Sequence, residues 1–528
     1  MKMISSLRPG LLMLLLAFCG AANAQKFKVN FSENAKMRYE FDDAAMLDNG
    51  QYIVLKSEPK GGGMFSGRIS WKTSLTLINS DMSVNTEKDL EVDDKKSDVG
   101  GFEKIKGKIF YIYNSYDSKS KTTSVNAMRI DEKTLSPLSK TILGSFESDN
   151  RFDQARPSFM FSNDSSKILL FVEGPERKKE NKKFFIGVYD TDLKFVWNKE
   201  VELPIGERYV SIYDQDVTND GKVFVSIKHY DKEVSRESVR EDGSKIPSYV
   251  YKLLVFSKES ATPKEINFNL NNNFIQGTKL AYNNNGSITV AGLYKRKHNG
   301  NINGAFYALI DPNSSNVNSP KMVDFPEDLV RLVDKDKFGS DKEKDPGLYR
   351  NFRIRQILKR TNGSVDLLSE YYRVDMVTVS RPNGGSTTYY RYISGDIVNT
   401  NIGADGKAIF TRVPKRQEMT NSTLFIGYAP IVYNDKLVLL YNDDEDNITR
   451  DLEKAPDDVL KFNKSVFAAA TIDAKGNLTR QAIYSHRDED YVFVPRSTAK
   501  ISDSKYLITA DLFKLFKKRT RYGVLEIQ

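Results

Sequence analysis

The fold of this chain is decided by a short phrase at positions 219–227, which reads Asn219-Asp220-Gly221-Lys222-Val223-Phe224-Val225-Ser226-Ile227. Asp-Gly is a dipeptide that suits the positive φ angles of a tight β-hairpin turn. The apolar run that follows it is short and rich in β-branched and aromatic residues, which is typical of a strand buried on both faces. The phrase therefore predicts the turn and the second strand of a hairpin.

The same phrase, a polar turn followed by an apolar strand, occurs eight times along the chain. Self-similarity of this kind indicates a repeat architecture in which each repeat is one supersecondary unit. The repeat continues unchanged beyond the polar run Asp334–Asp345, so we expect one ring of repeats rather than two domains. The eight apolar strands are Gln51–Glu58, Lys108–Tyr116, Lys167–Gly174, Lys222–Tyr230, Ser287–Lys295, Ser364–Tyr372, Lys436–Asp443 and Lys505–Phe513.

Each unit has room for four strands, which we call a to d. In the fourth unit we expect strand a at Tyr209–Thr218, b at Val223–Ile227, c at Ser248–Ser257 and d at Glu265–Leu270. Repeated four-stranded sheets around a centre define a propeller. We therefore predict an all-β fold, a single β-propeller of four-stranded antiparallel blades. Eight blades are favoured, with seven as the alternative if one unit is irregular.

The closure of the ring can also be predicted. The last unit has a strand c at Arg519–Ile527 but no residues left for a strand d, whereas a spare strand precedes the first unit, at Lys26–Phe31 or Lys36–Phe41. Because an open sheet edge invites aggregation, we expect the N-terminal strand to pair with Arg519–Ile527.

The first 24 residues have the form of an export signal. Lys2 and Arg8 supply positive charge, Leu11–Phe18 form a short apolar core, and Ala22-Asn23-Ala24 offers small residues for cleavage. We expect residues 1–24 to be a signal peptide and 25–528 to be a single β-propeller domain. Cleavage before Cys19, the only cysteine, is the alternative. The protein should then be exported, either periplasmic or associated with the outer membrane, with an extracellular location as a further option and no transmembrane segment in the mature chain.

Most insertions follow strand b, so the face that carries the b–c connections is the candidate functional surface. The sixth unit predicts the longest projection, a hairpin made of Tyr371–Ser380 and Ser386–Ile393. Tyrosine and arginine are the residues that most often anchor interfaces. The alternative is that the tyrosines only brace the hairpin. The candidate binding residues are Tyr371, Tyr372, Arg373, Arg381, Tyr389, Tyr390, Arg391 and Tyr392.

Several b–c connections are basic, and the fifth carries Lys295, Arg296 and His298. Such a face could attract an anionic partner such as lipopolysaccharide or an anionic glycan. The alternative is a set of solvated loops. Asp443-Asp444-Glu445-Asp446 on the same face opposes the attraction. The net charge of +9 is a small surplus over many charges of both signs, so we expect no nucleic-acid partner.

Signals for catalysis are weak. His229, His298 and His486 have no metal-binding spacing. The chain lacks a G-x-S-x-G elbow and a phosphate-binding P-loop. We predict no cofactor and no metal. Paired carboxylates from separate blades would leave no local pattern, so glycoside hydrolysis stays open.

Some stretches carry a resemblance: Val188–Pro204 followed by Val217–Val223, Ala404–Phe410 with Val413–Gln417, and Ile472–Asn477. Together they resemble a family of exported, functionally uncharacterised propeller-like proteins of the Bacteroidota. The shared motifs are turns and packing residues, so no active site is transferred. The resemblance implies a location in the envelope of a Gram-negative bacterium, where soluble subunits serve outer-membrane secretion and uptake machines.

Two hypotheses of function follow. The favoured one is a non-enzymatic binding or scaffold propeller of the cell envelope that docks a protein partner. A specific version is a soluble subunit of an outer-membrane secretion translocon, type IX-like, or of an uptake complex. The alternative is an envelope glycan hydrolase or lyase with carboxylates round the central opening. Clustered carboxylates of perturbed pKa would favour the enzyme, and a Tyr/Arg-rich apolar patch would favour the binding protein.

Overall fold

The structure is a computed structural model. It describes residues 25–528 except 33–34, 37–39, 61–69, 93–99, 149–155, 175–176, 178, 233–236, 242–243, 312–319, 335–345, 381–383 and 515–516. The predicted signal peptide lies outside the described residues, and so do the loop position Arg381 and most of the polar run Asp334–Asp345.

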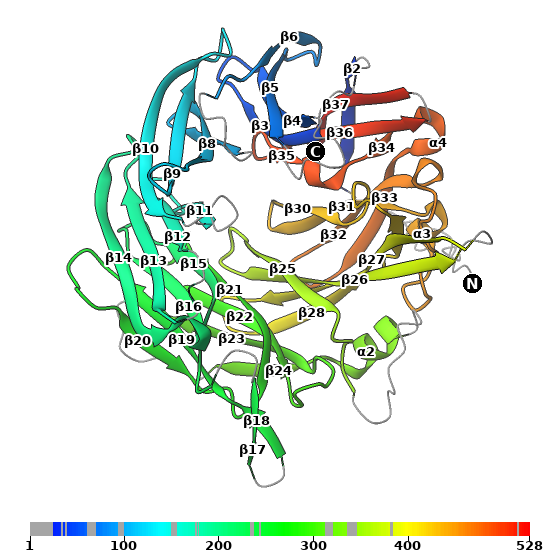
Figure 1. Ribbon diagram of the computed structural model, residues 1–528. Helices are drawn as coiled ribbons and strands as arrows, with labels where there is room; N and C mark the ends of the chain where they lie inside the picture. Colours follow the sequence, from blue (N-terminus) through cyan, green and yellow to red (C-terminus); the bar gives the residue numbers. More distant parts are fainter. Residues whose placement is uncertain are drawn as a thin grey trace, which may run out of the picture.

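The chain forms antiparallel sheets arranged round a ring (Figure 1). We number the sheets of four or more strands from 1 to 8 in chain order, except that the first strand of the chain belongs to the last sheet. The assignment of eight blades rather than seven stays a prediction. The all-β propeller fold itself is confirmed.

The strands of the sheets are as follows. Sheet 1 has β3 (Glu40–Met46), β4 (Tyr52–Lys60), β5 (Ser70–Ile78) and β6 (Val84–Asp89); sheet 2 has β7 (Gly101–Ile105), β8 (Lys108–Asp117), β9 (Thr122–Ile130) and β10 (Pro137–Glu147). Sheet 3 has β11 (Arg156–Phe161), β12 (Ile168–Glu173), β13 (Asn181–Tyr189) and β14 (Phe195–Gly206); sheet 4 has β15 (Val210–Val217), β16 (Val223–Tyr230), β19 (Tyr249–Phe256) and β20 (Lys264–Phe268). Sheet 5 has β21 (Phe274–Tyr282), β22 (Ile288–Lys295), β23 (Gly304–Ile310) and β24 (Lys321–Asp324); sheet 6 has β25 (Phe352–Lys359), β26 (Val365–Ser380), β27 (Ser386–Ile402) and β28 (Ala408–Val413). Sheet 7 has β30 (Tyr428–Tyr433), β31 (Lys436–Asp443), β32 (Val466–Ile472) and β33 (Leu478–Ser485); sheet 8 has β34 (Val492–Phe493), β35 (Ala499–Lys500), β36 (Lys505–Lys514) and β37 (Lys517–Ile527), with β1 (Phe27–Phe31) and β2 (Ala35–Lys36) from the start of the chain.

The predicted b strands are confirmed as interior strands of their sheets, and most of their apolar residues are buried. In β12, for example, Ile168, Leu169 and Leu170 are all completely buried. Burying one such aliphatic side chain stabilises the fold by about 1.5–3 kcal/mol. The turn before β16 places Gly221 at a φ of +85°, the conformation that the Asp-Gly signal requires.

Buried clusters between successive sheets hold the ring together. The cluster at the junction of sheets 8 and 1 contains Leu507 and Tyr522 from the last sheet, and Tyr52 and Val54 from the first. Seven further clusters join the other neighbouring sheets in turn. The core is therefore a series of apolar layers, each shared by two sheets.

The ring closes as the sequence predicts. Strand β1 pairs antiparallel with β37, from Phe27 opposite Ile527 to Phe31 opposite Gly523. Its alternate residues face the cluster between sheets 7 and 8. Phe31 contacts the ring of Tyr484 edge to face, with centroids 5.4 Å apart. The first of the two predicted closing strands is thus the correct one.

The connections between sheets carry several extra elements. The b–c connection of sheet 4 forms its own hairpin, β17 (Ser238–Glu241) with β18 (Ser244–Pro247), and that of sheet 7 includes α3 (Glu445–Thr449). The d–a connections also carry α2 (Glu327–Asp334), β29 (Gln417–Thr420) and α4 (His486–Glu489), which we did not predict. Across the described residues, no helix is both long and apolar enough to cross a membrane.

Candidate functional site

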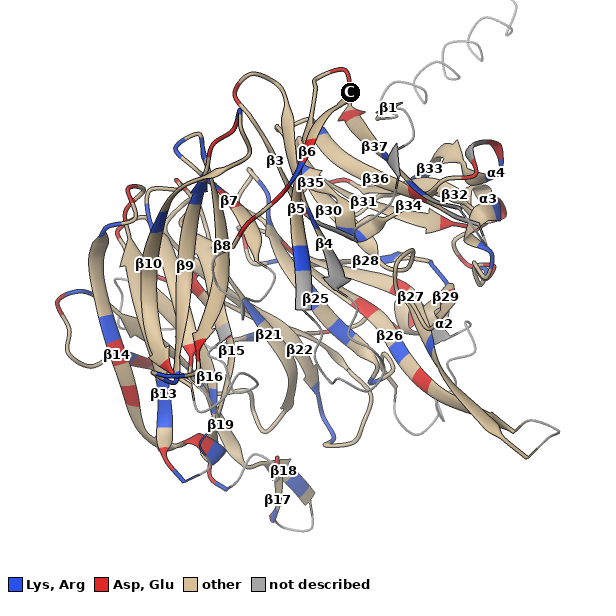
Figure 2. Cartoon of the chain, turned by 45° about the horizontal axis from the view of Figure 1, so that its top comes forward, with Lys and Arg blue, Asp and Glu red and all other residues tan. Residues whose placement is uncertain are grey.

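The hairpin of β26 and β27 projects from the ring (Figure 2). Strand β25 pairs with β26 only as far as Tyr371, where Phe352 lies opposite it. Beyond that point the two long strands continue together to Ser380 and Ser386. The predicted hairpin of the sixth unit is therefore present, and the outer edge of β26 past Arg373 has no strand partner within the part of the chain that the structure describes.

One face of this hairpin is apolar. Directly opposed residues of an antiparallel pair share a face, and the faces alternate along each strand. Val374 lies opposite Tyr392, and Met376 lies opposite Tyr390. Three of these side chains are well exposed: Met376 at 67%, Tyr390 at 48% and Val374 at 45%. We call Tyr372, Val374, Met376, Tyr390 and Tyr392 the apolar hairpin face.

The opposite face carries charges that neutralise one another. Arg373 and Arg391 both donate to Oδ2 of Asp375, at 3.0 and 2.8 Å. Although partial burial opposes it, the hydrogen bonds from these guanidinium groups hold the pKa of Asp375 below its usual range. Tyr389 shares this face and is half-buried, opposite Val377. Arg373 and Arg391, two of the three hairpin arginines predicted as binding residues, are therefore largely engaged within the hairpin.

The base of the hairpin is packed into the core. Tyr371 is only 1% exposed and contacts the rings of Tyr349 and Phe352. Tyr372 lies under the guanidinium group of Arg355, 4.6 Å from it, and packs with Tyr392 against a buried apolar cluster. All three tyrosines therefore pack at the base of the hairpin, and Tyr371 is buried there.

A buried ion network fixes the same base. Nζ of Lys415 donates to Oε1 of Glu370 at 2.8 Å and also bonds the Ser394 hydroxyl. Arg355 donates to the other carboxylate oxygen of Glu370 at 2.7 Å. Burial raises the pKa of Glu370, but the charges of Lys415 and Arg355 outweigh it and hold the pKa below its ordinary value. The Ser394 hydroxyl and the Lys415 ammonium group are in contact, as in a serine–lysine catalytic pair. Both side chains are completely buried, however, so no substrate can reach them in this structure.

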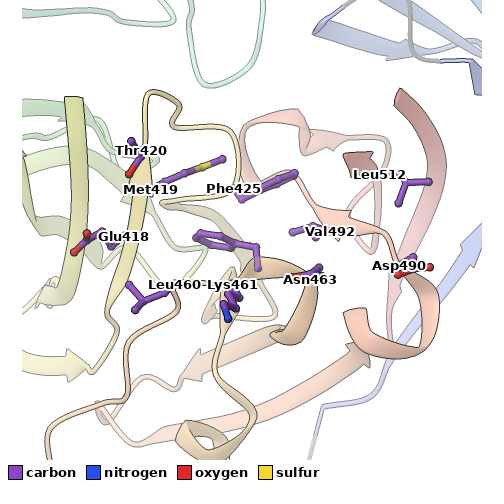
Figure 3. Close-up of a pocket in the computed structure, with 11 residues that line it drawn as sticks. Glu418, Met419, Thr420, Phe425, Leu460, Lys461, Asn463, Asp490, Val492 and Leu512 are labelled. Atoms are coloured by element: carbon purple, nitrogen blue, oxygen red, sulfur yellow. The ribbon is translucent and has the colours of Figure 1, made fainter. Parts of the chain in front are cut away.

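Next to the apolar hairpin face lies a cavity of about 570 Å³ (Figure 3). Its walls come from β29 and the segment after it, from the b–c connection of sheet 7, from the connection that leads to sheet 8, and from β34 and β36 of that sheet. Phe425 and Phe462 belong to the buried cluster beneath it, whereas Leu460 is 61% exposed. Met419, which lines the cavity, also sits opposite Tyr392 in the sheet, so cavity and hairpin face are continuous. The cavity is lined by Glu418, Met419, Thr420, Phe425, Leu460, Lys461, Phe462, Asn463, Asp490, Val492 and Leu512.

The basic residues of the fifth unit lie on a different loop, between β22 and β23. Lys295 donates to the carbonyl oxygen of His298 at 2.9 Å, and burial lowers the pKa of this lysine. Arg296 pairs with Asp324 at 2.5 Å. The His298 ring packs edge to face on Phe274. The structure therefore divides the predicted binding residues between two separate places, on sheets 5 and 6.

Three aspartates on strands near the centre of the ring have structural partners. Asp43, Asp214 and Asp216 stand on innermost strands and accept backbone N–H groups of the neighbouring sheet, at 2.8 Å in each case. Burial raises the pKa of all three. Burial, and then the carboxylate of Asp43, raise the pKa of Glu103 to about 7.

The buried histidine His486 is also structural. Its Nδ1 lies 3.1 Å from the carbonyl oxygen of Phe462, and its Nε2 accepts the backbone N–H of Phe493 at 3.4 Å. Burial lowers its pKa to about 4. Because both ring nitrogens are occupied by backbone groups, His486 is a neutral packing residue.

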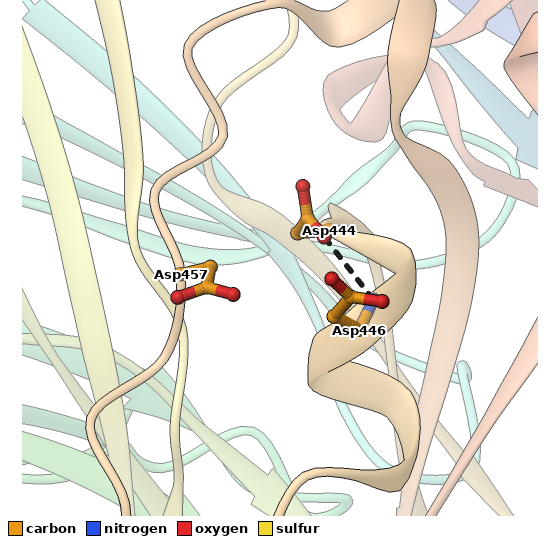
Figure 4. Close-up of side chains that lie close together, drawn as sticks. All are labelled: Asp444, Asp446 and Asp457. Carbon is orange, nitrogen blue, oxygen red and sulfur yellow. Dashed lines mark hydrogen bonds between the residues drawn. The ribbon is translucent and has the colours of Figure 1, made fainter.

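The acidic run after β31 is only partly a solvated loop. Asp443 is completely buried, and burial raises its pKa to about 7. Asp444 caps α3 by accepting the backbone N–H of Asp446 (Figure 4). Carboxylate oxygens of Asp444, Asp446 and Asp457 lie within 4.8 Å of one another, the ligand type that hard cations prefer. Arg450 already pairs with Asp457, which lowers the attraction for a cation.

Comparisons with known proteins reach only the level of the fold. No protein-family model matches the chain, and no curated protein matches it either. Among solved structures, the β-propeller domain of the Trilobed protease from Pyrococcus furiosus aligns over 86% of this chain and 98% of its own, at 12% identity and a TM-score of 0.37. The polysaccharide lyase Uly1 aligns over 80% and 89%, at 10% identity and a TM-score of 0.36. A protein of unknown function from Dyadobacter fermentans aligns over 71% and 94%, at 11% identity and a TM-score of 0.29. The chain is a β-propeller protein, and its resemblance to a Bacteroidota family stays a prediction.

Proposed function

We propose that this protein is a non-enzymatic binding scaffold of the cell envelope, which docks a protein partner through the apolar hairpin face and the adjacent cavity. The observation that carries the proposal is the exposure of Val374, Met376 and Tyr390 on one face of a hairpin whose base is rigidly held. Exposed apolar patches on a fixed scaffold are typical of interaction sites.

The chemistry of the hairpin indicates what kind of partner it suits. The outer edge of β26 offers backbone N–H and C=O groups to another strand, and its Val374–Ser380 sequence is rich in β-branched residues. An extended segment could add to this edge by main-chain hydrogen bonds, with apolar side chains at alternate positions lying over Met376. The proposed partner is therefore a protein that presents an extended, alternating apolar strand.

The proposed cellular setting rests on the sequence alone. The export signal expected at residues 1–24 supports a periplasmic or outer-membrane-associated protein. A soluble subunit of an outer-membrane secretion complex, type IX-like, or of an uptake complex is the specific form of this proposal.

The alternative of a glycan hydrolase or lyase draws less support from the geometry. Glu103 has the raised pKa of a general acid, with Asp43 beside it. Both carboxylate oxygens of Asp43, however, accept backbone N–H groups, from Ala44 and Phe102. Asp214 and Asp216 accept backbone N–H groups of the neighbouring sheet in the same way, so the role common to all three is to join neighbouring sheets.

The test places an acidic side chain in the apolar hairpin face. Met376→Asp and Tyr390→Asp should each lower recovery of the partner from native envelopes at least tenfold, because anchors at interface centres contribute about 2 kcal/mol or more. Ile142→Asp is the matched control, since Ile142 is an equally exposed apolar residue, at 59%, on sheet 2. A photo-crosslinker at position 376 should label the same partner. Unchanged recovery in both hairpin variants, with unchanged melting temperatures, would contradict the proposal.

A further inference from the structure

A second site lies away from the apolar hairpin face, where the β17–β18 hairpin meets the β22–β23 loop. A cavity of about 300 Å³ separates the two segments. Its wall contains three cationic side chains, an imidazole, a hydroxyl and an amide, and none of its lining residues is acidic. We call it the basic pocket; it is lined by Ser244, Lys245, Arg296, Lys297, His298 and Asn299.

The first wall of the basic pocket carries an unfavourable arrangement of charge. Strands β17 and β18 pair only with each other within the described residues. Arg240 lies directly opposite Lys245 in this two-stranded ribbon. Like charges directly opposed across strands destabilise a sheet, and an isolated two-stranded hairpin has little stability to spare. An anion bound in the pocket beside Lys245 would weaken that repulsion.

The ribbon is nevertheless firmly anchored at its root. Glu237, just before β17, accepts from Nζ of the buried Lys228 and from the hydroxyl of Tyr230, both at 3.3 Å. The Lys228 ammonium group also lies 4.2 Å from the Tyr249 ring centre. The backbone N–H of Ser248 donates to the Glu237 carbonyl oxygen. These contacts fix one wall of the pocket to sheet 4.

The second wall is fixed to sheet 5. The backbone N–H of Arg296 donates to Oδ1 of Asn303 at 2.8 Å, and Gly300 donates to the carbonyl oxygen of Lys297. The bond from Lys295 to the carbonyl oxygen of His298 closes the turn. One guanidinium nitrogen of Arg296 pairs with Asp324, which orients the group without removing the surplus of positive charge in the pocket. The backbone of both walls is thus fixed, and the guanidinium group of Arg296 is oriented, before any ligand arrives.

We propose that the basic pocket binds a phosphate group, either of a soluble phosphate monoester or of a lipid headgroup. A dianionic oxyanion matches a pocket with three cations, because charge-assisted hydrogen bonds from Lys and Arg are the strongest that a protein offers to phosphate. The hydroxyl of Ser244 and the amide of Asn299 supply neutral donors. This site is independent of the proposed protein docking, since it lies on other sheets and uses other residues.

The experiment uses the full mature chain and two probes. Calorimetric titration with glycerol 3-phosphate tests the soluble source, and flotation with phosphatidylcholine vesicles containing phosphatidic acid tests the lipid source. Lys245→Ala with Lys297→Ala should weaken binding of the relevant probe about tenfold or more, because both changed side chains lie in the pocket. Lys133→Ala, on an exposed turn of sheet 2, should bind as the parent does.

Each outcome decides the proposal. Saturable binding of glycerol 3-phosphate that is lost in the double variant assigns a soluble ligand. Binding only to vesicles with phosphatidic acid, lost in the same variant, assigns a lipid headgroup. Absence of binding to both probes, or equal binding by the double variant and Lys133→Ala, would overturn the proposal. Both lysines are exposed, so circular dichroism should show that the double variant folds.

Discussion

Replacing Phe31 by alanine should loosen the strand that closes the ring. The Phe31 side chain is half-buried, which is worth about 1 kcal/mol as removed apolar surface. Its edge-to-face contact with Tyr484 adds about 1 kcal/mol. The free energy needed to separate β1 from β37 should fall by roughly 2 kcal/mol in total. Amide exchange in β1, and along the edge of β37 that β1 covers, should then be about thirtyfold faster.

Hydrogen exchange followed by mass spectrometry measures this effect peptide by peptide. Asn30→Ala is the matched control, because Asn30 is exposed on the other side of the same strand and should leave exchange nearly unchanged. A global melting temperature is a poor substitute, since in a chain of this size a local loss of stability shifts it very little. Exchange in β1 that is the same in Phe31→Ala and Asn30→Ala would refute the reasoning.

A second substitution tests the contact itself. A Cβ added at Gly523 would lie 2.8 Å from the ring of Phe31, too close for the ring to stay in place. Gly523→Ala should therefore loosen β1 in the parent but cost much less in the Phe31→Ala background, where the space is free. The coupling between the two changes should be about 1 kcal/mol. Strictly additive effects would show that Phe31 does not cover Gly523.

Three further perturbations follow from buried charges. Folding raises the pKa of Asp443 to about 7, so between about pH 4 and 7 the carboxyl group is protonated in the folded protein and ionised in the unfolded one. The free energy of unfolding is therefore highest below about pH 4 and falls as the pH rises to about 7. Asp443→Asn keeps the oxygen that accepts a hydrogen bond from Asn447. The variant should therefore have the same unfolding free energy as the parent at pH 4 and a higher one at pH 8, by no more than roughly 4 kcal/mol. Equal unfolding free energies of parent and variant at both pH values would contradict this. The unfolding free energy of Glu103→Gln, measured in urea, should likewise rise relative to that of the parent between about pH 4.5 and 7. A parent that gains stability relative to the variant over this pH range would disprove the raised pKa of Glu103. Lys415→Met should lower the unfolding free energy by roughly 3–5 kcal/mol because it leaves Glu370 buried with one partner fewer, whereas Lys415→Met with Glu370→Gln should cost less; a double variant as unstable as the single one would exclude the ion pair as the cause.

Much of the fold could be predicted from the sequence because the decisive signals are local. The turn at Asn219–Gly221 and the run Val223–Ile227 specify a hairpin within nine residues, and the same signal recurs wherever a b strand exists. The closing strand follows from counting, since the last unit lacks a strand that Phe27–Phe31 can supply. The long hairpin of sheet 6 follows from two runs of strand-forming residues on either side of one Gly-rich turn.

The site was less predictable because burial depends on residues far apart in the chain. Tyr371 and Tyr390 look alike in the sequence, yet the first lies against Tyr349 and Phe352 while the second is exposed. Likewise Asp443 begins an acidic run but ends a buried strand, and only the structure separates it from Asp444. The cavity beside Leu460 draws its walls from strands and connections of sheets 6, 7 and 8, so no local pattern could reveal it.

The alternation within the hairpin contains one further signal that is local. Val374, Met376, Tyr390 and Tyr392 fall on a single face once the two strands are aligned from the turn outwards. That alignment separates Arg373 and Arg391, which share the other face with Asp375, from the apolar residues. Strand alternation alone is therefore enough to divide the candidate residues of the hairpin correctly between its two faces.

The hairpin of sheet 6 also has a mechanical consequence. Its strands continue those of the buried sheet, because β26 and β27 each run as one strand from the sheet into the projecting hairpin, with one register shift in their pairing between Glu370 and Tyr372. A partner that pulls along the strand axis therefore applies a shear force to many of the hydrogen bonds between β26 and β27 at once. That force is passed on to the rest of sheet 6, where β26 and β27 lie between β25 and β28. A partner that pulls sideways bends the projecting part against the lock formed by Glu370 and Lys415. The element thus acts as a stiff lever, and movement of whatever binds its tip would be transmitted to the ring as a rotation of one sheet against its neighbours.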